Sequence, residues 1–319
     1  MSNKTALVLR ATGSQGKGVT KHLLQAGWTV HALVTDPENP RAVALKNQGA
    51  VLFKGALNDP SSIEAAIKGA GFLFLNQMPS FVDDSETKDA ASILSIAKAA
   101  GVQHVVHSTV LTLNDPVVRD KMAKSPLGPA VVGKADVGNL VRESGLPWTE
   151  IRGGYFMTNF LLPFSSITFP ELCTKRLVSS YDPDQLLPLI DPDDIGAFTA
   201  AAFQGPPKFT GQVINLACEK LGLVDIGAEM SRVSRHKVEV VFRTPEETAE
   251  LSKTNLLVMS QTLTPDLDKR VDIGDLKKWD IPLTSWRQFL EKRKDDLQEA
   301  LVSNAGSESF ASALKTITK

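Results

Sequence analysis

Cysteine and tyrosine are scarce in this sequence, with only two of each among 319 residues. Cys173 and Cys218 do not make a disulfide framework, and they lack the paired, close spacing of a structural zinc site. The chain also contains no His-Glu-x-x-His and no Gly-x-Ser-x-Gly segment, which excludes the common zinc-protease and serine-hydrolase motifs. We therefore expect the two cysteines to be buried packing residues and the protein to bind no metal.

Neither sign of charge is in excess, because 35 Lys and Arg residues face 36 Asp and Glu residues, for a formal net charge of -1. This balance provides no basic field that would hold a nucleic-acid backbone. No segment reaches the roughly 18 consecutive apolar residues of a membrane span, and the N-terminus carries no secretory signal. We expect a cytoplasmic protein that has neither nucleic acid nor a membrane as a partner.

The sequence does contain a regular alternation of short, β-branched apolar runs with segments of helical period. This pattern is typical of βαβ units around a parallel sheet. A glycine, which favours the end of a helix, follows four of the predicted helices, at Gly27, Gly69, Gly101 and Gly145. The sequence therefore predicts an α/β fold with a doubly wound parallel sheet, whose strands are residues 6–9, 29–34, 51–53, 72–75, 105–107 and 148–151.

The composition changes near Gly153, where the alternation gives way to a proline-rich stretch. A predicted apolar helix at 194–203 is followed by a predicted strand at 212–217, which would return to the main sheet, so the second region is interrupted. We predict a first domain of residues 1–155 and about 190–218. A smaller α/β domain would comprise about 156–189 and 219–300, followed by a mobile polar tail at 301–319.

The first predicted strand leads through Arg10-Ala11-Thr12-Gly13-Ser14-Gln15-Gly16 into a helix. Glycines in such a turn let the backbone approach a pyrophosphate, and the helix N-terminus presents free N–H groups and a partial positive charge. A tight turn without a ligand uses the same residues. Its place as the first βα turn of an alternating series favours a dinucleotide site.

The same segment resembles the Gly-Ala-Thr-Gly-x-Gln-Gly fingerprint of the NmrA-like family, a branch of the atypical short-chain dehydrogenases that includes isoflavone-reductase-like enzymes. The resemblance extends from about residue 4 to residue 293. Other blocks that resemble the family, in the same order, are Asp36-Pro37 with Arg41, residues 55–60, Gly133-Lys134, residues 154–160 and residues 191–197.

The resemblance implies a Rossmann domain that binds NAD(P) and a smaller substrate-binding domain. Some members of the family reduce quinones, isoflavonoids, dyes or fungal secondary metabolites. Others are redox sensors, which bind the dinucleotide and regulate a partner protein without turnover. The fold does not decide between these functions.

Three departures from the family pattern concern the cofactor. Arg10 stands where the fingerprint has its first glycine. Thr35 stands where NADP-preferring relatives commonly have an arginine, and Ala56 replaces an aspartate that often holds the adenine edge. One interpretation is that the pocket is degraded and dinucleotide binding is weak or lost.

The other interpretation is that the site for the 2′-phosphate has moved. Arg10, Lys17 and Arg41 would surround this phosphate, since guanidinium groups pair bidentately with phosphate oxygens. We favour this interpretation, and with it NADPH or NADP as the cofactor. NAD remains the alternative, because the Asp36 carboxylate would suit a ribose hydroxyl.

The Tyr-x-x-x-Lys pair of common short-chain dehydrogenases is absent, because Asn159 and Gln185 stand four residues after the two tyrosines. Lys134 is the catalytic candidate, since it matches the lysine that isoflavone-reductase-like members use. We place Lys134 at the start of a helix, whose positive end would lower its pKa toward a value useful for proton transfer. The alternatives are a solvated lysine and one that only hydrogen-bonds the cofactor.

The remaining candidates lie at strand ends, where a parallel sheet exposes its carboxyl edge to ligands. Ser108 and Thr109 would bind the nicotinamide ribose or a substrate carbonyl, and the alternative is that these hydroxyls only form the turn after the strand. Tyr155 and Phe156 match a family block that lines the cleft between the domains, where an aromatic pair would stack on the nicotinamide or a planar substrate. The alternative for this pair is a core role. The expected cofactor-binding residues are Arg10, Thr12, Gly13, Ser14, Gln15, Gly16, Thr35, Arg41, Ala56, Leu57, Asn76, Gln77, Met78, Ser108, Thr109, Lys134, Tyr155, Phe156 and Asn159.

The leading hypothesis is an NADPH-dependent reductase of a small organic molecule, as in secondary metabolism. The second hypothesis is a redox-sensing transcriptional regulator that acts through a protein partner. It is favoured by the absence of the Tyr-x-x-x-Lys pair and by the altered adenosine pocket. A third is an enzyme that keeps the cofactor but catalyses cyclisation or rearrangement.

Overall fold

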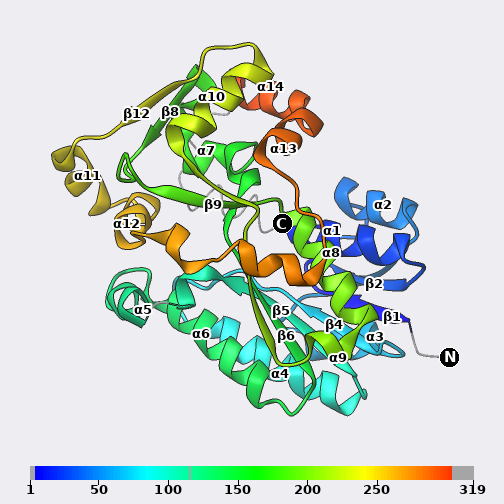
Figure 1. Ribbon diagram of the computed structural model, residues 1–319. Coiled ribbons are helices and arrows are strands. Elements are labelled where there is room, and N and C mark those ends of the chain that lie inside the picture. The colour runs from blue at the N-terminus through cyan, green and yellow to red at the C-terminus, as the bar shows by residue number, and fades with distance from the viewer. Residues whose placement is uncertain (1–3, 115, 304–319) are drawn as a thin grey trace. The chain divides into compact units, whose positions relative to one another are not determined.

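The computed structural model describes residues 4–114 and 116–303, and these residues fall into two compact units (Figure 1). The first unit comprises residues 4–113, 128–153 and 192–215, and the second comprises 114, 116–127, 154–191 and 216–303. Most of the polar tail predicted at 301–319 lies outside the described residues, from residue 304 onward.

A seven-stranded sheet in the order β10-β6-β5-β4-β1-β2-β3 forms the centre of the first unit (Figure 1). Strands β1 to β6 pair in parallel. The chain crosses over between β3 and β4, so strand order reverses at the neighbouring strands β1 and β4. The bounds are β1 Thr5–Val8, β2 Thr29–Val34, β3 Val51–Lys54, β4 Phe72–Leu75, β5 His104–Val110, β6 Trp148–Gly153 and β10 Gln212–Leu216. The predicted α/β class, the six strands and the return of 212–217 to the main sheet are confirmed.

Helices connect these strands, and local sequence explains where several of them begin. Asn39 and Asp59 each accept a backbone N–H bond in the first turn of a helix whose first residue is proline. The four glycines predicted to end helices all have φ between 75° and 79°. The helices of this unit are α1 Ser14–Gln25, α2 Pro40–Asn47, α3 Pro60–Ile67, α4 Ser85–Ala99, α6 Gly128–Glu143, α8 Pro192–Gln204 and α9 Pro206–Phe209.

Two packing arrangements hold the first unit together. Helices α3, α4 and α6 cover an apolar cluster to which alternate residues of β1 and β4 contribute, among them Leu7 and Leu73. Helix α1 packs against α8, where a Cβ on Gly196 would lie 2.3 Å from the carbonyl carbon of Gly18. The absence of a side chain at Gly196 therefore permits the close approach of the two helices.

The second unit contains two small sheets, with strand orders β11-β9-β7 and β12-β8. Its strands are β7 Tyr155–Phe156, β8 Arg176–Ser179, β9 Leu186–Ile190, β11 Glu219–Gly222 and β12 Glu239–Phe242. Residues 116–127, which the sequence analysis assigned to the first domain, group with this unit because α5 contacts α12. The helices are α5 Pro116–Ala123, α7 Ser165–Thr168, α10 Leu223–Ser234, α11 Pro245–Ser252, α12 Leu256–Leu263, α13 Trp286–Lys292 and α14 Lys294–Val302.

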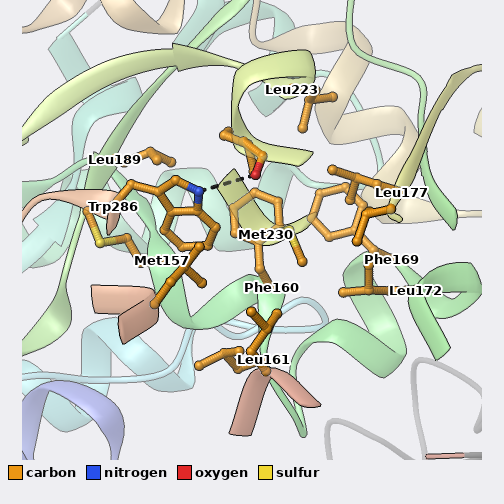
Figure 2. Close-up of a cluster of buried hydrophobic side chains, with 14 of the residues drawn as sticks. Met157, Phe160, Leu161, Phe169, Leu172, Leu177, Leu189, Leu223, Met230 and Trp286 are labelled. Carbon is orange, nitrogen blue, oxygen red and sulfur yellow. Dashed lines mark hydrogen bonds between the residues drawn. The ribbon is translucent and has the colours of Figure 1, made fainter. Parts of the chain in front are cut away.

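Aromatic side chains occupy the middle of the core of the second unit (Figure 2). Phe160 stacks on Phe169 with ring centroids 4.9 Å apart, and Trp286 lies 5.2 Å from Phe160. The indole N–H of Trp286 donates to the Ile226 carbonyl at 3.3 Å, as the dashed line in Figure 2 shows. The largest side chain of this core thus has its one polar atom satisfied.

The cysteines differ from expectation, because both are half-buried rather than buried. Cys218 packs at the edge of the aromatic core, whereas the Cys173 thiol donates to the Pro170 carbonyl at 3.2 Å. Within the described ranges, no helix combines the length and the apolar character needed to cross a bilayer.

We expect Trp286→Ala to lower the free energy of unfolding by about 3–5 kcal/mol, because it leaves a large cavity in a fully packed core. Thermal and urea denaturation followed by circular dichroism will measure the effect. Trp286→Phe should lose much less, and Val224→Ala, at a side chain that is 58% exposed, should change stability by under about 0.5 kcal/mol. Equal losses in the three variants would contradict this account of the core.

Candidate functional site

The turn between β1 and α1 has the geometry that a dinucleotide site requires. The Gly13 N–H donates to the Arg10 carbonyl at 2.9 Å, and a Cβ on Gly16 would lie 2.2 Å from the same oxygen. Gly13 precedes α1 and offers no side chain that could cap it. The N–H groups of the first helical turn therefore lie at the carboxyl end of β1 without a side-chain cap, in the arrangement that suits a phosphate.

Arg10 has a left-handed backbone, with φ of 50°. For a residue with a Cβ this conformation is unfavourable by roughly 1–2 kcal/mol relative to the right-handed region. The turn thus keeps a glycine-like conformation although an arginine occupies the position. Burial lowers the pKa of the Arg10 guanidinium, which shows that its charge lies partly within the protein rather than in open solvent.

Polar residues at the end of β5 connect this strand to the first helical turn of α1. The Ser108 hydroxyl donates to the Gln15 side-chain oxygen at 2.5 Å. Thr109 is also buried, at 4% exposure, and its hydroxyl has no hydrogen-bond partner among the described residues. Since buried hydroxyls are nearly always paired, the Thr109 oxygen is a position from which a ligand or a water molecule would be bound.

The end of β4 carries a second group of buried polar side chains. Asn76 and Gln77 are 7% and 6% exposed, and Met78 is half-buried. The Gln77 amide N–H donates to the Glu86 carbonyl at 2.9 Å, while the Gln77 side-chain oxygen lacks a partner within the described part of the chain. The carboxyl ends of β4 and β5 thus each present an unsatisfied buried oxygen.

Lys134 lies beside these strand ends, but not at the start of a helix as the sequence analysis expected. Helix α6 begins at Gly128, so Lys134 is in its second turn. The Lys134 Nζ donates to the Gln77 carbonyl at 2.7 Å and forms an ion pair with Glu86 Oε1 at 2.5 Å. Lys134 is 7% exposed, so it is not a solvated lysine.

The electrostatics of Lys134 follow from this burial. Burial lowers the pKa of Lys134, Glu86 opposes that effect, and the positive charge of Arg10 lowers the pKa further. The cause of the lowered pKa is therefore desolvation, and not the helix N-terminus that we expected. Burial in turn raises the pKa of Glu86, and Lys134 opposes it.

Glu86 is the residue of this site that the sequence analysis missed. It lies in the first turn of α4, and its exposed fraction is 4%. A signal was present in the sequence, because Glu86 has the helical spacing of Ala90, Ile93 and Ala97, all fully buried. A carboxylate on the apolar face of a helix indicates a buried cation nearby.

Another group of titratable side chains lies on β5, β6 and α6, next to the Lys134 pair. Burial lowers the pKa of His107 to about 3, and Lys134, Arg142 and Arg152 act in the same direction. Glu150, the residue opposite His107 in the sheet, forms ion pairs with Arg142 and Arg152. His107 is therefore uncharged near neutral pH.

The residues expected near the adenosine lie at the ends of β2 and β3, on the other side of β1 from β4. Thr35 is exposed, and Arg41 stands in the first turn of α2. The Asp36 carboxylate accepts a bond from the Glu38 N–H at 3.0 Å. Ala56 exchanges hydrogen bonds with the Ser62 hydroxyl, and Leu57 packs against the core.

Tyr155, Phe156 and Asn159 belong to the second unit, on β7 and the turn that follows it. The Tyr155 ring lies 5.7 Å from that of Phe160 and 6.3 Å from that of Tyr181. Burial raises the pKa of the Tyr155 phenol well above its usual value. Tyr155 thus contributes to the packing of the second unit, and its role toward a cofactor stays a prediction.

Among residues 4–114 and 116–303, no cluster of three or more His, Cys, Asp or Glu side chains could hold a metal ion. The first unit instead offers a buried ammonium group, that of Lys134, at the carboxyl edge of its parallel sheet. The phosphate-type turn at Gly13 and Gly16 lies at the same edge.

Comparisons with known proteins agree with this architecture. The model of the NmrA-like family matches residues 2–267. A (4-alkanoyl-5-oxo-2,5-dihydrofuran-3-yl)methyl phosphate reductase from Streptomyces griseus is 28% identical over 62% of this chain and 63% of its own length, which is less than two thirds of that protein. The NAD(P)H azoreductase of Xenophilus azovorans is 26% identical over 76% of this chain and 78% of its own length.

Solved structures show the same fold. NmrA, a negative transcriptional regulator solved in complex with NAD, superposes with a TM-score of 0.73 at 24% identity, covering 94% of this chain and 99% of the other. NmrA has also been solved in complex with NADP, and it superposes with a TM-score of 0.72. At this identity the likeness establishes the Rossmann fold.

We expect Gly16→Ala to destabilise the protein by about 1–3 kcal/mol, because its Cβ would overlap the Arg10 carbonyl, a backbone atom that cannot rotate away. Differential scanning calorimetry will measure the change. Gly205→Ala is the matched control, since a Cβ there would make an ordinary contact at 3.6 Å. Equal stability of both variants would contradict the close approach in the first turn.

Proposed function

The chain belongs to the NmrA-like family, and on this basis we propose that it is an NADPH-dependent reductase of a small organic molecule, in which Lys134 acts on the acceptor. The observation that carries the proposal is the buried Lys134 ammonium, held on the Gln77 carbonyl at the carboxyl edge of the sheet. Ligands of doubly wound folds bind at this edge, where the strand order reverses.

The residues of the first unit fit the dinucleotide. The turn at Gly13 and Gly16 leaves room for a pyrophosphate, which a side chain at Gly16 would remove. Thr109 and Gln77 offer buried oxygens without partners among the described residues. These groups would hold the ribose and the nicotinamide, and Arg10, Lys17 and Arg41 would hold the 2′-phosphate.

Lys134 would supply the proton for the reduction. Bound NADPH supplies a hydride, so a reduced carbonyl or conjugated acceptor needs a proton on its developing oxyanion. A cationic Lys134 would donate a proton from Nζ or stabilise the oxyanion electrostatically. Its lowered pKa suits this role, because a weaker base gives up its proton more readily.

The named activities of the relatives support this reaction class. The Streptomyces griseus protein is named as a reductase of (4-alkanoyl-5-oxo-2,5-dihydrofuran-3-yl)methyl phosphate, and the Xenophilus azovorans protein as an NAD(P)H azoreductase. The assignment of the cofactor to the first domain and of the substrate to the second stays a prediction.

We expect the protein to bind NADPH with micromolar affinity in calorimetric titrations against NADPH, NADP, NADH and NAD. Arg10→Ala should weaken NADPH binding by about 10- to 100-fold, as expected for one charge-assisted hydrogen bond, and NADH binding less. Arg235→Ala is the matched control, because Arg235 also has a positive φ, of 61°, but lies exposed in the second unit. Absence of binding by all four dinucleotides would overturn the proposal.

We expect Lys134→Met to lower kcat by about 10²–10⁴-fold on a substrate found by screening NADPH oxidation. This range is the usual contribution of acid–base catalysis. Because the variant leaves Glu86 buried without its partner, Lys134→Met/Glu86→Gln serves as a stability control. Unchanged turnover in a folded Lys134→Met variant would remove the catalytic role.

A redox-sensing regulator is the second candidate, and one observation favours it. Lys134 already satisfies two of its three N–H groups within the protein, as a structural lysine does. A protein partner that is retained only at one NADPH/NADP ratio, with no turnover of any acceptor, would support this function. Robust substrate-dependent oxidation of NADPH would count against it. Cyclisation or rearrangement of a bound substrate stays a prediction without an observation of its own.

A further inference from the structure

Glu86 approaches Lys134 from a different helix and is buried more deeply than its partner. The side chains of Glu86 and Lys134 are 1% and 9% exposed, respectively. Helices α4 and α6, which carry them, pack side by side in the first unit (Figure 1). The ion pair is therefore formed inside the protein, where water screens it little.

Three neighbours surround Glu86, two of them at its carboxylate and one at its backbone. Oε1 is bound by Lys134, and the Gln77 side chain donates to the Glu86 backbone carbonyl. Behind the carboxylate, a Cβ on Gly133 would lie 3.1 Å from Oε2. Glycine at this position leaves the carboxylate the space it occupies.

The ammonium group is oriented by the same contacts. Of its three N–H groups, one donates to the Gln77 carbonyl and one to Glu86 Oε1, which leaves the third for a reacting atom. If Glu86 were absent, one of the two anchors would be lost and the Nζ would be free to rotate away from the sheet edge.

The titratable groups that interact with Lys134 come from three elements besides its own. Arg10 in the first turn is positive and lowers the pKa of Lys134, as burial does. His107 on β5 is neutral near pH 7, because burial lowers its pKa to about 3. Glu86 on α4 is the group that raises the pKa of Lys134.

We propose that Glu86 is a positioning residue for the reaction assigned to Lys134: its carboxylate, which reaches in from α4, holds the ammonium on the Gln77 carbonyl and balances its charge inside the protein. This inference rests on the proposed function, and it makes Glu86 and Gly133 part of the machinery. Glu86 itself transfers no proton to the substrate.

The test follows the protonation of Lys134 directly. Protein labelled with ¹³C-lysine is titrated without cofactor, and the Lys134 Cε resonance is identified by its absence from Lys134→Met. We expect a lower titration midpoint in Glu86→Gln than in the wild type, because the group that raises the Lys134 pKa is removed. An unchanged or higher midpoint in Glu86→Gln overturns the proposal.

Activity provides the second readout. In Glu86→Gln, kcat should fall by about tenfold or more, but by no more than the roughly 10²–10⁴-fold that acid–base catalysis contributes, with little change in KM. The alkaline limb of the pH profile should move to lower pH, since Lys134 acts in its protonated form. Glu86→Asp should restore part of the loss. A fall in kcat with an unmoved pH profile would indicate a merely structural role and contradict the proposal.

Gly133→Ala keeps both charges and displaces only the carboxylate, so it decides the matter if Glu86→Gln does not fold. A lowered midpoint and a lowered kcat are expected, and wild-type values for both overturn the proposal. Glu229→Gln, which breaks ion pairs with Arg232 and Arg287 in the second unit, is the matched control and should leave the Lys134 midpoint in place. Because the titration needs no cofactor, its result is separate from a failure of NADPH to bind, which would overturn the proposed function alone.

Discussion

A buried ammonium ion has to be compensated within the protein, because moving an unpaired charge out of water is unfavourable by several kcal/mol. For Lys134 the compensation comes from the Glu86 carboxylate and the Gln77 carbonyl. These partners bring α4, α6 and the end of β4 to one point of the first unit. Gly133 is small at this point because any side chain would press on the carboxylate. One charge thus explains the local arrangement of three elements, and the same charge is the one that a reductase would use.

A second constraint is the close approach of backbones around α1. Its first turn lies against the Arg10 carbonyl, and Gly18 lies against Gly196 of α8. The turn keeps its shape even where the family fingerprint loses a glycine, because Arg10 accepts a left-handed backbone. The substitution therefore adds a cation to the site without removing the phosphate-type turn, and that cation acts on Lys134.

Most of the first unit could be predicted, because its pattern is local. Alternating apolar runs indicated β1 to β6, and glycines indicated four helix ends, all of which have a positive φ. The start of α6 was wrong, since no capping residue marks Gly128 and the family block begins at Gly133. Glu86 was missed because its partner is 48 residues away in the chain. Spacing within one helix showed an unusual carboxylate position but not the cation it meets.

The sequence by itself determined the fold class, the family and the presence of a phosphate-type turn, because each follows from short segments whose own residues are close together in the chain. Only the tertiary structure decided the state of Lys134. Its pKa is set by burial, by Glu86 and by Arg10, which come from different elements. Likewise, the resemblance left Tyr155 between a role in a cleft and a role in the core, and only the structure shows that its ring packs against aromatic residues of the second unit. Electrostatic environment and packing arise from contacts distant in sequence, and these exist only once the chain has folded.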